Sequence, residues 1–394
     1  MRESFDLQGV RVIVTDADTR LGLYIIRALG RVGCRITALS HEPVGRHVIG
    51  FASRFVAARH WIPRSVHYRE ALVNTVEEIA GTHDVLVPIS TLSIEIVAQH
   101  ASYLAPKIQF CVPDLRRFRE ANDKSTTTSI AKSIGIPVPE TYHDIDPETI
   151  EEWSRDAKVT FPLVVKFSDD RRDTLWNPAD RYRIVRSSKE LALEYRRMHA
   201  VGDHPLIQEY IQGPGYGFFS LGGESGQPLI TFCHKRLREY PISGGPSTFC
   251  ESIYDKRLID LGTKMLTTLK LKGVAMVEVK LDQQSNEYKF LEINPRFWGS
   301  LPLALHCGVN FPSYLVQMAL GITPRMEFDY PVGVKVRFLF TDILAACDTW
   351  RRNKSLSFVR QYIGELFDPS IKDGMIEADD LGPLTAYIRS SLRR

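Results

Sequence analysis

Short apolar runs alternate with amphipathic stretches over the first 112 residues. Runs of about four to eight apolar residues favour buried strands, whereas apolar residues three or four apart favour helices. Strands that alternate with helices predict a parallel, doubly wound α/β sheet with a crevice at the carboxyl ends of its strands. The expected strands cover 10–15, 34–39, 84–90 and 108–112, and the expected helices cover 21–32, 67–80 and 92–103.

The turn after the first strand, TDADTRLG, tests whether this sheet binds a dinucleotide. A pyrophosphate-binding turn needs the glycines of G-x-G-x-x-G, because backbone N–H groups must approach the phosphates closely. Here only Gly22 is present, and Asp16 and Asp18 would repel an anion. The turn therefore disfavours an NAD(P)-dependent oxidoreductase, while the prediction of the sheet is unaffected.

The pattern changes after Pro113, where helices give way to a series of strands. This pattern predicts an α+β region, and the polar turn QQSNE predicts that its last two strands form a hairpin. The section 336–394 is predicted to be mostly helical. The expected strands of the α+β region cover 161–168, 205–221, 228–253, 273–282 and 288–297, with breaks at glycine and proline, and the expected helices cover 189–198 and 255–270.

Composition and charge narrow the class of protein. The 394 residues are 44% hydrophobic and 25% charged, which is typical of globular domains. A net charge of +3 argues against a general nucleic-acid binder. The six cysteines form no C-x-x-C pair, so reduced thiols are expected. The chain shows no apolar signal core and no run of about 18 apolar residues, so we expect a cytoplasmic protein with no membrane partner.

The stretch FLEINPRFWGS at 290–300 carries the clearest candidate chemistry. Glu292, Asn294 and Arg296 alternate with apolar residues, so on a strand they share one face. The hairpin would bring Glu278 beside them. Carboxylate and amide oxygens suit Mg²⁺, and an arginine fork suits a phosphate or carboxylate. The alternative is a solvated strand edge, and this stretch alone does not decide between the two.

Two lysines and a short strand precede this hairpin. Lys124 opens a helix and Lys166 ends a strand, and a lysine ammonium is suited to the phosphates of a nucleotide. The segment IQEYI at 207–211 offers backbone groups that can pair with an adenine edge. Taken singly, each of these features is more typical of an ordinary surface or strand.

Taken together, the features resemble the ATP-grasp superfamily, of the carboxylate–amine ligase and carbamoyl-phosphate-synthetase-like kind, over about residues 1–335. The motif order is an α/β domain, an entry lysine, a strand lysine, QEYI, a flexible loop and VEV…LEINPR. The implied domains are a Rossmann-like pre-ATP-grasp domain, an ATP-grasp domain of two α+β subdomains and a helical C-terminal section. Their expected bounds are 1–112 for the first domain, 113–335 for the second (subdomains 113–204 and 205–335) and 336–394 for the last section.

The resemblance also implies roles for individual residues. Lys124 and Lys166 would contact the phosphates of ATP, and Arg296 would stabilise the transferred phosphoryl group. Arg236 is the candidate anchor of the acid substrate, in a segment where His234 and Arg238 are also basic. The implied Mg²⁺ ligands, with Mn²⁺ as a substitute ion, are Glu278, Glu292 and Asn294. The implied adenine-binding residues are Gln208, Glu209, Tyr210 and Ile211.

Two departures from the superfamily pattern weaken the transfer of the nucleotide site. The segment 168–182 has no glycine where many members carry a glycine-rich phosphate loop, and Arg171 and Arg172 are its candidate substitutes. The acidic residue that often follows QEYI is also missing, and Glu209 is its candidate substitute.

Three functions are compatible with these features. The first is an ATP-dependent ligase that joins a small carboxylic acid to an amine, with an amino acid or small peptide among its substrates. The second is a non-catalytic or regulatory nucleotide-binding protein, and the third is a carboxylase that activates bicarbonate. Small molecules are the expected partners, nucleic acid is not, and a homodimer is compatible with the sequence.

Overall fold

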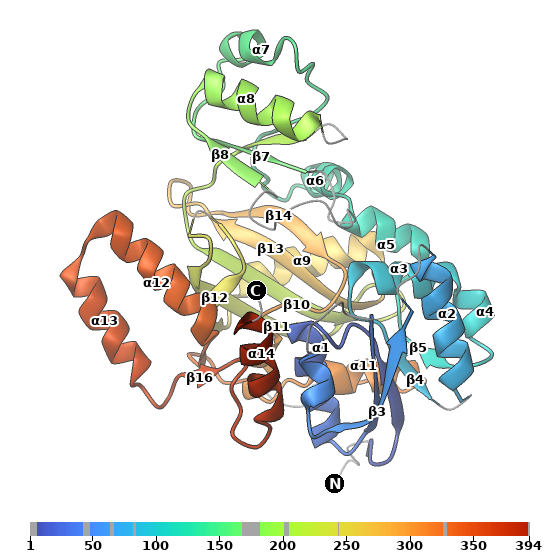
Figure 1. The fold of residues 1–394 in the computed structure, drawn as a ribbon. Coiled ribbons are helices and arrows are strands. Elements are labelled where there is room, and N and C mark those ends of the chain that lie inside the picture. The colour runs from blue at the N-terminus through green and yellow to red at the C-terminus, as the bar shows by residue number, and fades with distance from the viewer. Residues whose placement is uncertain are drawn as a thin grey trace. The chain divides into compact units, whose positions relative to one another are not determined.

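The computed structural model describes residues 6–41, 48–63, 67–81, 84–167, 182–200, 205–242, 244–325 and 329–392 (Figure 1). Contacts divide the chain into two units. Unit 1 comprises 1–118, 218–276 and 295–394, and unit 2 comprises 119–217 and 277–294. The units follow spatial contacts and not chain order, and the three-part division expected from the sequence stays a prediction. No described helix is long and apolar enough to span a membrane.

Unit 1 contains the predicted parallel sheet, in the order β3-β2-β1-β4-β5. Its centre is β1, whose Val12 lies in register with Ile36 of β2 and Val85 of β4. The sequence missed β3, because its residues VAARHWI alternate between half-buried and exposed positions and do not form an apolar run. The strands are β1 (Arg11–Val14), β2 (Arg35–His41), β3 (Val56–Ile62), β4 (Val85–Val87) and β5 (Gln109–Phe110).

Helix α1 (Arg20–Arg31) begins directly after the acidic turn. The Thr19 hydroxyl accepts from the Gly22 N–H and caps the helix. A Cβ on Gly22 would lie 2.4 Å from the Asp16 carbonyl oxygen, so this glycine permits close packing of helix against turn. The other early helices are α2 (Tyr68–Ile79), α3 (Thr91–Gln99), α4 (Ala101–Leu104) and α5 (Leu115–Asn122), with a 3₁₀ turn at Gly50–Ala52.

A second sheet has seven strands in the order β14-β13-β10-β11-β12-β15-β16. The predicted last two strands, β13 and β14, are neighbours, which agrees with the expected hairpin. The last part of the chain adds two strands that the sequence did not predict, β15 beside β12 and β16 beside β15. The strands are β10 (Gly215–Gly222), β11 (Pro228–Glu239), β12 (Ser247–Ile253), β13 (Gly273–Leu281), β14 (Tyr288–Asn294), β15 (Lys335–Arg337) and β16 (Lys372–Asp373).

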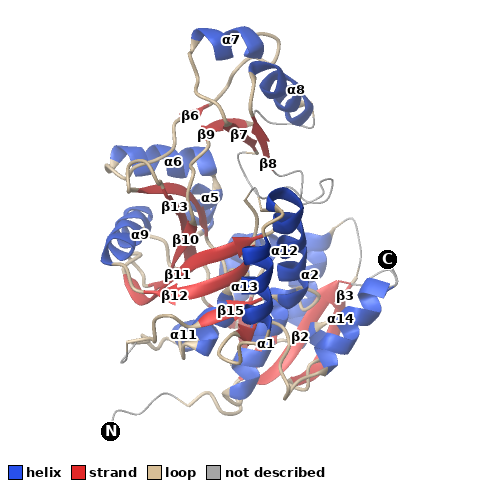
Figure 2. Cartoon of the chain, turned by 90° about the vertical axis from the view of Figure 1, so that its left-hand side faces the viewer, coloured by secondary structure: helices blue, strands red, loops and turns tan. Residues whose placement is uncertain are grey.

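Helices complete unit 1, and Figure 2 shows them in blue beside the red strands. The Asp255 side chain caps α9 by accepting from the Arg257 and Leu258 N–H groups. The C-terminal section is mostly helical, as predicted. The helices are α9 (Lys256–Leu269), α10 (Leu301–His306), α11 (Phe311–Ala319), α12 (Leu339–Asn353), α13 (Leu356–Leu366) and α14 (Gly382–Leu392).

Unit 2 has its own four-stranded sheet, in the order β6-β9-β7-β8. The central strand β7 pairs antiparallel with β8 and β9, and Val164 lies in register with Gln208. Its strands are β6 (Thr141–Tyr142), β7 (Leu163–Lys166), β8 (Tyr182–Val185) and β9 (Leu206–Glu209), and its helices are α6 (Lys124–Ser133), α7 (Ile150–Asp156) and α8 (Ser188–His199).

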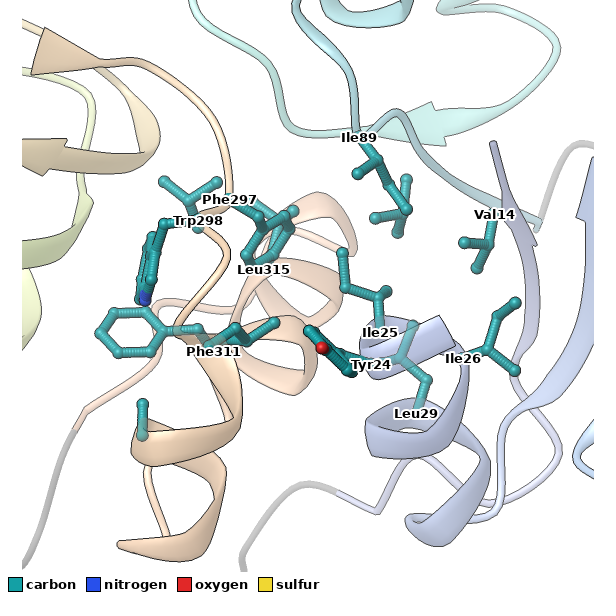
Figure 3. Close-up of a cluster of buried hydrophobic side chains, with 14 of the residues drawn as sticks. Val14, Tyr24, Ile25, Ile26, Leu29, Ile89, Phe297, Trp298, Phe311 and Leu315 are labelled. Carbon is teal, nitrogen blue, oxygen red and sulfur yellow. The ribbon is translucent and has the colours of Figure 1, made fainter. Parts of the chain in front are cut away.

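The residues after the LEINPR motif lie in the main apolar core of unit 1 (Figure 3). Trp298 stacks on Phe219 with ring centroids 4.2 Å apart and meets Phe311 edge to face at 5.0 Å. Such aromatic pairs stabilise a core beyond the area that they bury. Trp298 therefore packs in the core. The parallel α/β sheet, the α+β sheets and the helical C-terminal section confirm the predicted fold class.

Candidate nucleotide and metal site

The end of β14 presents the predicted polar side chains. The Asn294 Nδ2 donates to Glu292 Oε1 at 3.1 Å, so these side chains share one face, as the alternation predicts. Asn294 is buried and Glu292 is half-buried. Glu278 is also half-buried, on the neighbouring strand β13. The strands therefore hold oxygen donors on a rigid part of unit 2.

Lys124 binds the other oxygen of Glu292. Its Nζ lies 3.0 Å from Glu292 Oε2, and the two side chains are 13% and 21% exposed. Lys124 is the first residue of α6, which Asp123 caps by accepting from the Thr126 N–H at 2.6 Å. The cap fixes the start of the helix, and α6 packs on β14. The entry lysine and the motif glutamate are thus in direct contact within unit 2.

Lys166 and the QEYI segment lie on neighbouring strands of unit 2. Lys166 ends β7 and lies in register with Leu206 of β9. Gln208 is buried, and its Nε2 donates to Thr141 Oγ1 at 2.9 Å. Glu209 holds the segment before β6 twice, since its N–H donates to the Glu140 carbonyl at 2.8 Å and its Oε2 accepts from the Glu140 N–H at 3.1 Å.

Lys280 is a candidate site residue that the sequence analysis missed. Its Nζ donates to the Ile211 carbonyl at 3.2 Å and lies 5.1 Å from the centre of the Tyr210 ring. One lysine therefore contacts both the Tyr210 ring and the Ile211 backbone. The available signal was its position, two residues after Glu278 and so on the same face of β13.

The basic segment of β11 lies in unit 1 and differs from the sequence expectation. Arg238 is bound on both sides: its Nη2 lies 2.8 Å from Asp342 Oδ2, and its Nη1 pairs with Glu365. It therefore anchors the C-terminal helices and is not available to a substrate. Arg236 Nη1 lies 3.3 Å from Glu239 Oε1, and Arg296 Nη1 donates to the Phe297 carbonyl at 3.0 Å.

His234 is also not basic, which corrects the expectation. Complete burial, and secondarily the Arg236 charge, hold the pKa of His234 well below its usual range. Its Nδ1 lies 3.1 Å from the Ser300 Oγ, at the start of α10. The imidazole is therefore neutral in the folded protein at neutral pH.

The burial of His234 predicts that the stability of the protein depends on pH. Because the unfolded imidazole takes up a proton near pH 6.5 and the folded one does so only at lower pH, stability is lost as the pH falls below about 6.5. The unfolding free energy of the wild type should fall between pH 7.5 and pH 5.5. In His234→Gln we expect this fall to be smaller by about 1.4 kcal/mol. Urea denaturation of both proteins at the two pH values measures it. Equal losses would show that His234 takes up its proton equally in the folded and unfolded states.

The donor set fits Mg²⁺ better than a softer metal. The described residues contain no cluster of three or more His, Cys, Asp or Glu side chains placed to hold a metal. Glu278, Glu292 and Asn294 would offer two carboxylates and one amide, which suits an ion that keeps several waters and binds substrate phosphates. All six cysteines are free, five of them buried.

The parallel α/β sheet, the two α+β sheets and the contacts among Lys124, Glu292 and Asn294 agree with the resemblance to the ATP-grasp superfamily. A family model described as ATP-grasp in the biosynthetic pathway with Ter operon matches residues 206–339.

Curated relatives match part of the chain. The alpha subunit of mitochondrial methylcrotonoyl-CoA carboxylase from Rattus norvegicus is 25% identical over 228 residues, covering 54% of this chain and 31% of that protein. D-alanine–D-alanine ligase from Rickettsia canadensis is 29% identical over 132 residues, covering 30% of this chain and 37% of that protein. The chain thus spans about a third of the length of these relatives.

Solved structures share the fold over most of the chain. The biotin carboxylase of Campylobacter jejuni, in complex with β-γ-ATP, matches with a TM-score of 0.65 at 16% identity, covering 84% of this chain and 75% of that chain. The ADP complex of an N5-carboxyaminoimidazole ribonucleotide synthetase matches with a TM-score of 0.60 at 15% identity, covering 83% and 79%. At these identities the likeness concerns the fold.

Proposed function

We propose that this protein is an ATP-dependent ligase that activates a carboxylate for attack by an amine. The observation that supports this most is the cluster of Lys124, Glu292 and Asn294, which joins the entry lysine to the motif carboxylate at 3.0 Å. A solvated strand edge would not require a half-buried carboxylate held by an ammonium and an amide.

The reaction has two steps. An oxygen of the substrate carboxylate attacks the γ-phosphorus of ATP, the bond to the β–γ bridging oxygen breaks, and ADP leaves. The amine then attacks the acyl carbon, the C–O bond to phosphate breaks, and the amine proton passes to solvent as the amide forms. Positioning and charge neutralisation dominate such phosphoryl transfer, so little covalent chemistry is asked of the protein.

Each proposed residue has a role in these steps. Lys124 and Lys166 bind the phosphates of ATP, and Arg296 stabilises the phosphoryl group in transfer. Arg236 anchors the acid, and the segment Gln208, Glu209, Tyr210 and Ile211 binds adenine, with Lys280 as its support. Glu278, Glu292 and Asn294 would hold Mg²⁺ or Mn²⁺. Bound metal supplies charge neutralisation at the phosphate oxygens. The candidate phosphate contacts Arg171 and Arg172 lie outside the described residues.

Relatives support two versions of this chemistry. The name of the Rickettsia relative, D-alanine–D-alanine ligase, favours an amino acid or small peptide as substrate. The carboxylase names among the relatives and solved structures favour bicarbonate as the acid, which is the second candidate. A nucleotide-binding protein without turnover is the third. A cytoplasmic location and a homodimer stay proposals.

A screen of ADP release distinguishes these candidates. The purified protein with MgATP is assayed with amino acids, dipeptides and bicarbonate, each alone and in pairs. Release that requires an acid and an amine together, with formation of an amide, supports the ligase. Release with bicarbonate alone favours the carboxylase. Nucleotide binding with no release over the panel would contradict both enzymes and favour the third candidate.

The lysines make a second prediction, which needs no substrate. We expect Lys124→Met/Lys166→Met to weaken ATP binding about a hundredfold, because each charge-assisted contact to phosphate is worth about tenfold or more. Calorimetric titration with MgATP measures it. Lys132→Met/Lys158→Met is the matched control, since both of these unit 2 lysines are exposed. Equal affinity of the two double variants for ATP would contradict the proposal that Lys124 and Lys166 bind the nucleotide.

A further inference from the structure

Helices α12 and α13 form a hairpin whose outer face is apolar and exposed. The two helices lie side by side in both views (Figures 1 and 2) and contact each other. No residue of α13 is buried. We use the name outer face for the exposed large apolar side chains of the whole hairpin, which are Ile343 (42%), Leu344 (48%), Trp350 (38%), Leu356 (77%), Ile363 (50%) and Phe367 (82%). Large apolar side chains exposed on two neighbouring helices indicate an interaction surface.

The opposite face of the hairpin is firmly held within unit 1. Asp342 of α12 is fully buried and accepts from Arg238 and from Thr248 Oγ1. Glu365 of α13 pairs with the same arginine, and its carbonyl accepts from Arg337 Nη1 at 2.8 Å. The outer face is therefore not exposed because the hairpin is loosely attached. It is the solvent side of a fixed element.

Cations are interspersed with these apolar side chains. Arg351, Arg352, Lys354 and Arg360 are all exposed. Within the fully described hairpin, 339–367, the acidic residues are Asp342 and Glu365, which bind Arg238, and Asp348, which lies 3.9 Å from Arg352. Exposed cations thus outnumber acidic residues around the outer face, although Asp348 partly neutralises Arg352. A second copy of this face would oppose like charges, whereas an anionic surface would complement it.

The side chains of α13 fit a flat anionic surface. Leu356, Arg360, Ile363 and Phe367 follow the spacing i, i+4, i+7, i+11, so they form one stripe along the helix. Arginine can extend to a phosphate while its neighbours enter the apolar layer, and tryptophan favours the boundary between the two. The described ends of the hairpin place Trp350, Arg351 and Arg352 beside the turn into α13.

We propose that the outer face of the α12–α13 hairpin binds an anionic lipid surface. Such a contact would be peripheral, made by the exposed side chains of the hairpin, and would add a membrane partner that the sequence analysis does not expect. It is independent of the proposed catalytic function. The apolar stripe and the cations act together, since each alone gives weak attachment.

Sedimentation with lipid vesicles tests this proposal. The full chain is mixed with vesicles of phosphatidylcholine containing about 30% phosphatidylserine, or of phosphatidylcholine alone, at low and high salt. We expect binding to the anionic vesicles that weakens with salt. Arg351→Gln/Arg360→Gln should lower the partition coefficient about 25-fold, because each cation near an anionic surface contributes about fivefold. Leu356→Ser/Phe367→Ser should also lower it.

Lys256→Gln/Arg257→Gln is the matched control, since it removes two consecutive exposed cations from α9. It should bind as the wild type does. Circular dichroism and urea midpoints establish that all variants are folded, and the substituted side chains are exposed enough to allow this. No binding to anionic vesicles at low salt would overturn the proposal, as would equal binding by all variants. A dimer in light scattering that Phe367→Ser abolishes would replace it with self-association.

Discussion

Glu292→Gln is expected to lower ATP-dependent turnover about a hundredfold or more, the effect typical of removing one preorganised charge stabiliser. In the folded protein both oxygens of Glu292 are engaged, one by Asn294 and one by Lys124. The amide keeps the shape but loses the charge that holds Lys124 and would hold Mg²⁺. Release of ADP, with the acid and amine found in the screen, measures the effect.

A binding experiment makes this prediction independent of the substrates. In the wild type, Mg²⁺ should tighten ATP binding relative to the same titration in EDTA, and Glu292→Gln should remove most of that difference. The control is Glu287→Gln, which changes an exposed glutamate in the turn just before β14. A variant at position 292 that keeps the full response to Mg²⁺ would refute the assignment of Glu292 as a metal ligand.

The sequence predicted those parts of the fold where local pattern and burial agree. Strand β4 is a buried run of Val and Leu, and β1 is a buried run of Val and Ile after its first residue, Arg11, as expected for strands covered on both faces. The strand β3 was missed because it lies at the edge of its sheet. Its half-buried and exposed positions alternate, and Arg59 and His60 interrupt its apolar residues. Strands β15 and β16 have three and two residues, too few to show a period.

In the candidate site, too, the sequence predicted the contacts between residues close together in the chain and missed those between distant residues. Alternation along β14 placed Glu292 and Asn294 on one face, and the hydrogen bond between them agrees. The alternation carries no information about partners distant in the chain. The sequence analysis placed Arg238 in a basic substrate segment. Its partners, Asp342 and Glu365, lie 104 and 127 residues away along the chain. Lys280 was missed for the same reason, since its partner Ile211 is 69 residues away.

A second large effect is expected at a buried ion pair that joins the two ends of unit 1. The Arg27 Nε lies 2.9 Å from Asp380 Oδ2, and both side chains are 1% exposed. Arg27 also donates to the carbonyl oxygens of Met375 and Asp380, each at 2.7 Å. Asp380 accepts in addition from the Ser53 hydroxyl at 2.7 Å and from the Arg54 N–H at 2.9 Å. The segment before α14 is therefore fastened to α1 and to the residues after the 3₁₀ turn.

Arg27→Met should lower the free energy of unfolding by about 3–5 kcal/mol, because it leaves Asp380 buried with its charge uncompensated. Urea denaturation followed by circular dichroism measures the loss. Adding Asp380→Leu to this variant should restore part of the lost unfolding free energy, since the unpaired buried carboxylate is then absent. Asp260→Asn, which breaks the exposed pair with Lys256, should change the midpoint little. A loss at Arg27 as small as that at Asp260 would mean that water reaches the pair and compensates for the missing partner.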